Sequence, residues 1–237
     1  MSRFLTLIVA PHLSAHATLV ALPDFEWRSY GLAIGVANRL ELSYARQDFN
    51  TQEVGAALGI GRGYRLNQDV LGAKVRLVGD LVYGDPLVPQ LSLGVQHKRN
   101  RDGPVAFAVG ANSKTGTDFT LSASKLLLSH SVLISATARL TSANQNGLLG
   151  FGSANGAGRK LQFEGSAAWQ LSRRSVIGAE FRSKPDNLGL GEDDWVDVFA
   201  AYALTDNITV TAAYADLGSI AAFDNQRGAF LSAQFAF

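Results

Sequence analysis

KLQFEGSAAWQLSRRSVIGAEFRS, residues 160–183, has the pattern of two β-strands joined by a short turn. With residues 172–174 as a three-residue turn, the two arms pair antiparallel, and residues directly opposite each other point to the same face. On one face this register gives three apolar pairs: Trp169 with Ile177, Ala167 with Ala179, and Gly165 with Phe181. On the other face it pairs Glu164 with Arg182. The stretch therefore predicts a hairpin with one apolar and one polar face.

Two other hairpins show the same division into faces. A turn at residues 37–39 matches apolar residues of both arms: Val36 with Leu40, Ile34 with Leu42, and Leu32 with Tyr44. A turn at residues 205–207 pairs Tyr202 with Val210 and Val198 with Tyr214, and sets Thr209 and Thr211 opposite Ala203 and Ala201. The hairpin around residues 129–130 fits less well, because Lys125 interrupts its apolar face, and we expect a β-bulge there.

Eleven segments of about ten residues alternate apolar and small polar side chains with a period of two, which is typical of β-strands. They span residues 25–36, 40–49, 69–82, 89–98, 117–128, 132–141, 160–171, 175–183, 194–204, 208–216 and 227–237. The short connections are residues 37–39, 83–88, 129–130, 172–174 and 205–207, and the longer ones are 50–68, 99–116, 142–159, 184–193 and 217–226. Short and long connections alternate. This indicates an all-β, up-and-down antiparallel transmembrane barrel of about 12 strands, the twelfth formed by residues 18–22 or nearby.

The composition fits strands that face lipid. The 237 residues include 21 Lys and Arg against 20 Asp and Glu, a net charge of +1, which gives no electrostatic attraction to nucleic acid. Charged residues make up 17% of the chain, against about 25% in an ordinary soluble domain, and there is no Cys. In a soluble β-sandwich the apolar faces would form the core, whereas in an outer-membrane barrel they meet the lipid bilayer. The low charge and the need to close the sheet edges favour the barrel.

The N-terminus has features of a secretory signal peptide. Arg3 would be its charged region, residues 4–10 its apolar region, and residues 15–17 (AHA) its cleavage site. We therefore expect residues 1–17 to be a signal peptide and residues 18–237 to be the barrel domain. The alternative is that the N-terminal residues form a first, irregular strand.

The last strand ends in apolar residues at alternating positions, with an aromatic residue at the terminus. These residues are Leu231, Ala233, Phe235 and Phe237. The pattern resembles the C-terminal assembly signal of bacterial outer-membrane proteins. The resemblance implies the outer membrane as the location and the outer-membrane barrel-assembly machinery as a partner.

Seven stretches after about residue 25 resemble one family of uncharacterised proteobacterial envelope proteins, domain of unknown function 3034. They are residues 40–49 (LELSYARQDF), 69–80 (DVLGAKVRLVGD), 89–100 (PQLSLGVQHKRN), 143–152 (ANQNGLLGFG), 184–199 (KPDNLGLGEDDWVDVF), 211–221 (TAAYADLGSIA) and 226–237 (QRGAFLSAQFAF). Their order and number make the resemblance specific, although residues 1–24 are dissimilar to the family. The resemblance implies an outer-membrane barrel and gives no activity.

The polar face of the strands would line the barrel interior. The charged residues with this predicted orientation are Arg28, Glu41, Lys74, Arg76, Arg139, Glu164, Glu180, Arg182 and Asp197. Both signs occur in nearly equal number, which favours cross-strand ion pairs that narrow the lumen over a strongly selective ion path. These residues are candidates for lining a pore, and equally for a purely structural role.

No spacing of residues indicates catalysis, a metal site or a cofactor. The histidines are His12, His16, His97 and His130, and none belongs to an H-E-x-x-H motif. The GIGRG sequence at residues 59–63 lacks the strand-then-helix context of a phosphate-binding loop. The acidic run at residues 192–194, with Asp186 nearby, could bind a hard cation, but a solvated loop is the simpler interpretation.

Three functions follow as hypotheses. The first is passive passage or binding of small polar solutes, which the mixed polar lumen favours. The second is a closed structural barrel whose loops at residues 50–68 and 142–159 bind a partner. The third is an outer-membrane hydrolase that uses His130, although we expect no enzyme. The oligomeric state has no signal in the sequence.

Overall fold

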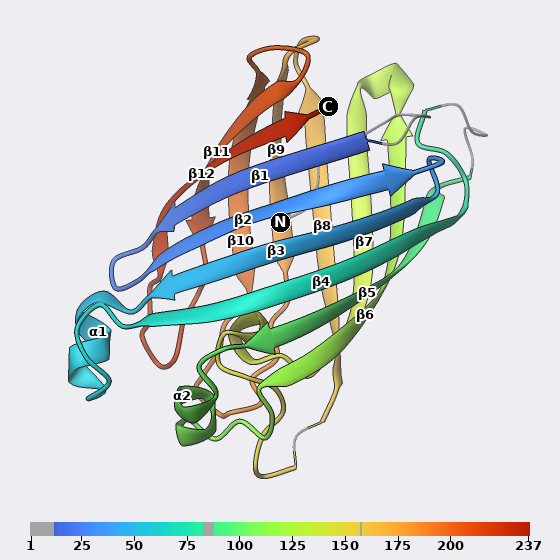
Figure 1. Cartoon of the computed structure of the whole chain (residues 1–237). Helices are drawn as coiled ribbons and strands as arrows, with labels where there is room; N and C mark the ends of the chain where they lie inside the picture. The colour runs from blue at the N-terminus through green and yellow to red at the C-terminus, as the bar shows by residue number, and fades with distance from the viewer. Residues whose placement is uncertain (1–11, 83–87, 157) are drawn as a thin grey trace.

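The computed structural model describes residues 12–82, 88–156 and 158–237. Within these residues twelve antiparallel strands form a closed barrel, in which each strand pairs with its neighbour in sequence and β1 pairs with β12 (Figure 1). The strands are β1 (His12–Ala21), β2 (Glu26–Val36), β3 (Leu40–Asn50), β4 (Arg65–Val78), β5 (Gln90–Asn100), β6 (Thr115–Leu127), β7 (Val132–Thr141), β8 (Lys160–Gln170), β9 (Ser175–Arg182), β10 (Trp195–Ala203), β11 (Ile208–Asp216) and β12 (Arg227–Ala236). Two short helices, α1 (Gln52–Ala57) and α2 (Gly103–Ala108), lie in long connections. The predicted up-and-down barrel is confirmed.

The three hairpin registers predicted from the sequence are also confirmed. Glu164 lies opposite Arg182 in the pair β8–β9, and the apolar pairs of β2–β3 and β10–β11 match as expected. The ends of the eleven strands lie within two residues of the prediction, except in β4. That strand begins at Arg65 instead of residue 69 and ends at Val78 instead of residue 82.

The β-bulge expected near Lys125 is absent, so this prediction was wrong. The register of β6 and β7 runs without a shift along the whole ladder, and Lys125 lies opposite Ile134 on the outer face. Its Nζ donates to the carbonyl oxygen of Val88 at 3.0 Å. Because a lysine side chain is long and flexible, its charge reaches the end of the barrel without an extra residue in the strand. The register shift occurs instead between β4 and β5, near Arg76 and Val78.

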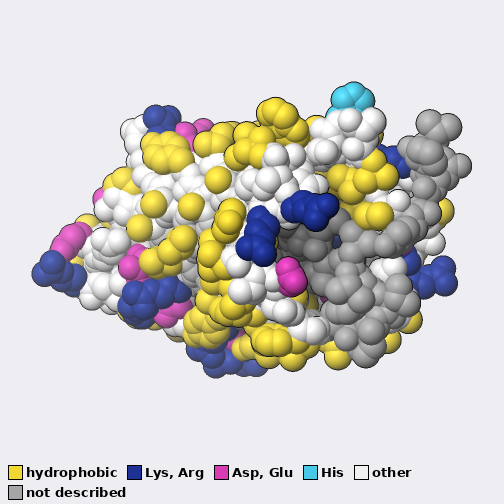
Figure 2. Space-filling view, turned by 90° about the horizontal axis from the view of Figure 1, so that it is seen from above, with side chains coloured by type: hydrophobic (Ala, Val, Ile, Leu, Met, Phe, Trp, Pro, Cys, Tyr) yellow, Lys and Arg dark blue, Asp and Glu magenta, His cyan; other side chains and the backbone are white. Residues whose placement is uncertain are grey.

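The outer wall of the barrel is apolar. Hydrophobic side chains cover much of the visible wall in Figure 2, and exposed fractions reach 53% at Leu32, 56% at Val198 and 59% at Tyr214. Water-soluble proteins rarely expose apolar patches larger than a few hundred Å². No helix in the described residues is long and apolar enough to cross a membrane. The outer wall therefore fits a barrel that contacts lipid through its strands.

A charge at the middle of this outer wall is expected to destabilise the barrel. Leu32, opposite Tyr44 on β3, is such a position. Leu32→Arg should lower the free energy of unfolding in lipid vesicles by about 2–4 kcal/mol, because the guanidinium enters hydrocarbon. A urea titration of the protein in lipid vesicles measures this free energy of unfolding. Ser135→Arg, which places the same charge in the lumen, should lower it less. Equal losses in the two variants would contradict the assignment of the outer face.

The N-terminal strand β1 closes the barrel. Its residues from Ser14 to Ala21 pair with both β12 and β2. The predicted cleavage site at residues 15–17 lies inside this strand, so cleavage after Ala17 would remove its first six residues, 12–17. Arg3 and residues 4–10, which carry the rest of the signal-peptide prediction, lie outside the described residues, as do residues 83–87 of one predicted turn. The signal peptide stays a prediction.

Long connections fill one end of the barrel, which is the lower end in Figure 1 with α1 and α2, while the C-terminus is at the opposite end. The connection between β7 and β8 turns inward. We call its residues 142–153 the inner loop, and all of them except Ser142 and Asn146 are buried. Two of its leucines pack into an apolar cluster, here called the apolar cap, whose larger members include Leu22, Phe25, Phe49, Leu66, Leu148, Leu149, Ile220 and Phe230. The end of the interior with the long loops therefore holds a packed apolar cluster.

Candidate functional site

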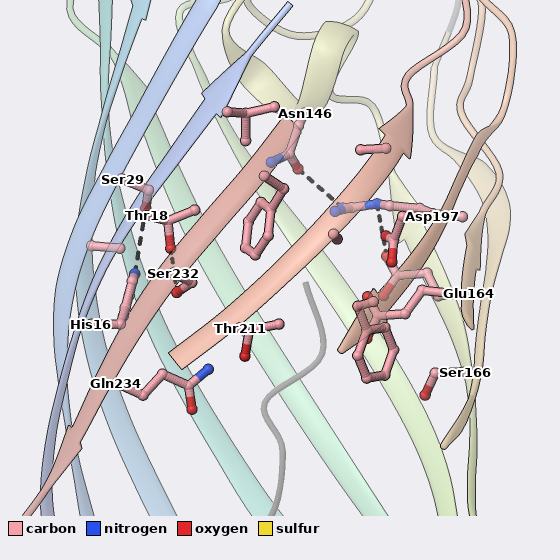
Figure 3. A pocket seen from close by; sticks show the side chains of 18 of the residues that line it. His16, Thr18, Ser29, Asn146, Glu164, Ser166, Asp197, Thr211, Ser232 and Gln234 are labelled. Carbon is pink, nitrogen blue, oxygen red and sulfur yellow. Dashed lines mark hydrogen bonds and ion pairs between the residues drawn. The ribbon is translucent and has the colours of Figure 1, made fainter. Parts of the chain in front are cut away.

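A polar cavity of about 590 Å³ occupies the interior of the barrel (Figure 3). Small polar side chains line much of it, among them His16, Thr18, Ser29, Thr211, Ser232 and Gln234. The hydroxyls of Thr18 and Ser232 lie 2.8 Å apart, which joins β1 to β12 across the closing seam. These groups share one face because every second residue of a strand points inward. The volume is within the range of about 300–1,000 Å³ that small-molecule sites have.

Five charged side chains from consecutive strands form a connected set across the barrel. We call them the ionic layer: Lys98 on β5, Asp118 on β6, Arg139 on β7, Glu164 on β8 and Arg182 on β9. Lys98 Nζ lies 2.8 Å and Arg139 Nη1 3.3 Å from Asp118 Oδ2. Arg139 Nε lies 2.6 Å and Arg182 Nε 3.1 Å from Glu164 Oε1. Cations and carboxylates thus alternate from strand to strand.

The tip of the inner loop binds to this ionic layer. Lys98 Nζ donates to Asn146 Oδ1 at 2.6 Å and to its backbone oxygen at 3.2 Å. Arg182 Nη2 donates to the same Oδ1 at 3.1 Å, and Gln68 Nε2 donates to the backbone oxygen at 3.1 Å. Asn146 and Gly147 have φ angles of 58° and 103°, which make the tight turn at the tip. Because the donors stand on β4, β5 and β9, the tip connects separate parts of the wall.

The structure brings most of the predicted lining residues to the interior. Five of them border the cavity: Arg139, Glu164, Glu180, Arg182 and Asp197. Glu41 and Lys74 lie opposite each other on β3 and β4, and Glu41 shares its face with Ser43, which borders the cavity. Arg76 lies on the same face of β4 and forms an ion pair with Asp80. Whether these side chains line a conducting path stays a prediction.

Arg28 lies outside the barrel, so its predicted inward orientation was wrong. It is opposite Leu19 on the outer face, its side chain is 50% exposed, and its Nη2 lies 2.8 Å from Glu26 Oε1. The neighbouring Trp27 takes the inward position and is buried. Arg28 stands near the end of β2 that adjoins the loops, where a charged side chain on the outer face can reach water. Polarity alone therefore misassigned its face.

Three residues of the site, Lys98, Asp118 and Asn146, were not predicted from the sequence. Lys98 is two residues after Gln96, and Asp118 lies opposite Gln96, which borders the cavity. Both already lie within the predicted strands at residues 89–98 and 117–128, so strict alternation would have placed both in the lumen. Asn146 carries no such signal, because it belongs to a loop without periodicity.

Two tryptophans border the cavity on the side of the apolar cap. Trp27 on β2 and Trp195 on β10 have ring centroids 6.1 Å apart. The indole Nε1 of each is buried and has no hydrogen-bond partner within the described part of the chain. The guanidinium carbon of Arg182 lies 5.3 Å from the centre of the Trp195 ring. Both rings and the Arg182 guanidinium therefore border the cavity, while the two indole N–H groups are buried away from its surface.

A second buried ion pair lies in the connections outside the strands. Lys184 Nζ is 2.8 Å from Glu192 Oε2, and both side chains are 4% exposed. Burial lowers the pKa of Lys184 and raises the pKa of Glu192, because each charged form loses water. Asp186 accepts the N–H groups of Leu190 and Gly191 at 2.9 and 3.1 Å. These acidic residues thus order the loop. The described residues hold no group of three or more His, Asp or Glu placed to bind a metal.

Ser129 and His130 form a contact in the exposed turn after β6, with Oγ 2.8 Å from Nδ1. A nucleophile and its base also need a third group that orients the base. Among the described residues no carboxylate hydrogen bonds to His130. The contact is between neighbours in sequence and has the geometry of a local turn interaction.

Three residues of the predicted assembly signal alternate along one face of β12, and the fourth, Phe237, follows directly after the strand. Leu231 and Phe237 are 57% and 69% exposed, and Ala233 and Phe235 lie on the same face. Recognition of this face by the barrel-assembly machinery stays a prediction.

A closed twelve-stranded barrel with an apolar outer wall and a polar, charged interior defines a porin-like barrel of the bacterial outer-membrane type. The chain belongs to the family described as protein of unknown function (DUF3034), whose model matches residues 11–234. The match confirms the resemblance found in the sequence and extends it to β1. No protein with a curated description matches this chain.

Several solved structures share the fold. The KdgM porin in complex with disordered oligogalacturonate is 12% identical, with 94% of this chain and 99% of that chain covered and a TM-score of 0.63. The COG4313 outer membrane channel from Pseudomonas putida F1 is 11% identical over 98% and 97%, with a TM-score of 0.54. An active-site mutant of the outer membrane phospholipase A from Escherichia coli is 11% identical over 99% and 94%, with a TM-score of 0.53. Since channels and an enzyme share this fold, it does not by itself give the function.

Proposed function

We propose that the protein is a porin-like, non-enzymatic channel of the outer membrane that binds and passes small polar solutes. The polar cavity of about 590 Å³ inside a lipid-facing barrel supports this most directly. Hydroxyl and amide groups on its wall can replace part of the water around a polar solute, and they hold it weakly enough to release it. Assembly into the outer membrane through the C-terminal strand belongs to the same proposal.

The inner loop would set the width of the path. Its tip is held by Lys98, Arg182 and Gln68, and its leucines are packed in the apolar cap. A solute that crosses the barrel has to pass this loop. We therefore expect low conductance with the loop in place, and higher conductance when its packing is disturbed.

Recording ion conductance in planar lipid bilayers tests the proposal. The refolded full-length chain should give discrete, low-conductance steps in potassium chloride. A gel shift on boiling confirms beforehand that the barrel is folded. Folded protein that gives no steps, either as the native chain or with the inner loop unseated, would contradict a channel function.

A second candidate is a closed barrel whose loops bind a partner protein. Leu58, directly after α1, and Phe107 in α2 are 53% and 50% exposed at the end with the long loops. The loop at residues 50–68 contains Leu58, whereas most of the loop at residues 142–159 is buried as the inner loop. Pull-downs with the native chain and with a variant that lacks α1 distinguish the partner-binding barrel from the channel. The partner-binding candidate requires a protein that the native chain captures and the variant does not.

A further inference from the structure

We propose that Lys98 and Arg182 form a binding site for the carboxylate of a small polyhydroxylated monocarboxylate, and that Asn146 of the inner loop occupies this site as an internal ligand. The inference names the solute class of the proposed channel and rests on that function. Two cationic donors from different strands converge on one neutral oxygen, Asn146 Oδ1. Lys98 Nζ lies 2.6 Å and Arg182 Nη2 3.1 Å from it.

The charges of the ionic layer favour a negative ligand at this point. Three cations, Lys98, Arg139 and Arg182, stand against two carboxylates, Asp118 and Glu164, which leaves one positive charge in excess. A neutral amide oxygen accepts the hydrogen bonds of Lys98 and Arg182 but does not balance this charge. A carboxylate oxygen at the same position would do both, and hydrogen bonds between charged partners are about twice as strong as neutral ones.

The rest of the cavity limits the ligand to one carboxylate. Glu180 and Asp197 lie opposite each other on β9 and β10 and border the same cavity, two residues along β9 from Arg182. A ligand with several carboxylates would bring further negative charge close to these two acidic side chains. A ligand with a single carboxylate can direct it toward Lys98 and Arg182 and leave an uncharged remainder in the cavity.

The remainder of the ligand meets groups that suit hydroxyls. The wall carries hydroxyl and amide side chains such as Thr18, Ser232 and Gln234. Hydroxyl and amide side chains donate as well as accept hydrogen bonds, so they suit a ligand that carries oxygen acceptors and O–H donors. A polyhydroxylated chain provides such acceptors along its length.

Isothermal titration calorimetry on the full-length protein in detergent tests the inference with three probes. Gluconate should bind, and sorbitol, which has a similar hydroxylated chain without the carboxylate, should bind at least about tenfold more weakly, the loss expected when charged donors lose their acceptor. Citrate, with three carboxylates, should also bind more weakly than gluconate. Equal affinity for gluconate and sorbitol, or tighter binding of citrate, would overturn the inference.

Variants of the inner loop separate the site from general charge attraction. Asn146→Ala removes the internal ligand and should tighten gluconate binding severalfold, whereas Asn146→Asp supplies a built-in carboxylate and should abolish it. Asn155→Ala, at an exposed position in the same β7–β8 connection, should change nothing. If Asn146→Ala does not fold, Asn146→Asp still decides, because gluconate binding that survives in it overturns the inference.

The conductance and calorimetry experiments can give negative results independently, and each negative result overturns a different proposal. Channel steps in potassium chloride without preference for gluconate over sorbitol in calorimetry would overturn the carboxylate site and leave the channel. Gluconate binding by a folded barrel that never conducts would overturn the channel and leave the site.

Discussion

Replacing Asp118 with asparagine is expected to lower the free energy of unfolding of the barrel by about 3–5 kcal/mol, the usual effect of breaking a buried ion pair from one side. Asp118 accepts from Lys98 Nζ at 2.8 Å, from Arg139 Nη1 at 3.3 Å and from Thr141 Oγ1 at 2.5 Å. The side chains of Lys98 and Asp118 are 2% and 1% exposed. The amide keeps the shape of the side chain but leaves the buried cations with one negative charge fewer.

Denaturant unfolding of the refolded protein in lipid vesicles, followed by tryptophan fluorescence, measures this loss. Asp216→Asn is the matched control, because Asp216 pairs with Arg227 at 2.7 Å while their side chains are 34% and 55% exposed. Its cost should be under about 1 kcal/mol, as for other surface pairs. Similar losses in the two variants would show that the ionic layer is hydrated and contributes no more than a surface pair.

Replacing Gly116 with leucine is expected to raise single-channel conductance severalfold by unseating the inner loop. Gly116 stands on the inner face of β6, opposite Lys98, and a Cβ atom built there would overlap Phe151 Cδ1. Phe151 is buried at the end of the inner loop, so it must move away. Overpacking of this kind costs about 1–3 kcal/mol, which a closed barrel can tolerate while the loop is displaced.

Planar-bilayer recordings of Gly116→Leu beside the native chain test this. Gly165→Leu is the control, because Gly165 lies opposite Phe181 on the outer face and the nearest atom to its added Cβ, the carbonyl oxygen of Ser135, is 3.9 Å away. Its conductance should match that of the native chain. If the conductance of Gly116→Leu is also unchanged while the protein is folded, the inner loop does not limit the path.

The strands and their pairing could be predicted from the sequence because the information is local. In a hairpin, residues opposite each other share a face, so a period of two together with a short turn fixes the register, as in the pair Glu164 and Arg182. The same rule failed at Arg28, because polar residues occur on both faces near the ends of a lipid-facing strand. It also failed at Lys125, whose long side chain made a regular strand look interrupted.

The candidate site could be predicted only in part. Alternation placed Arg139, Glu164 and Arg182 inside the barrel, and near-balanced charge predicted ion pairs among them. Alternation gives the face of a residue, but it does not give its height in the barrel or its neighbours two strands away. The ion pairs of the ionic layer join neighbouring strands, but Arg139 Nη1 also donates to Gln96 Oε1 at 2.9 Å, from β7 to β5, and Asn146 contacts donors on β4, β5 and β9.

The amino-acid pattern was thus sufficient for the barrel, its strand pairing and its apolar outer wall, because each of these follows from side-chain alternation along paired strands. The inward path of the inner loop, and the position of Asn146 between Lys98 and Arg182, required the folded chain. The loop has no periodicity, and its direction is set by the packing of its leucines into the apolar cap and by donors from strands far apart in sequence. Such contacts exist only once the barrel has closed around them.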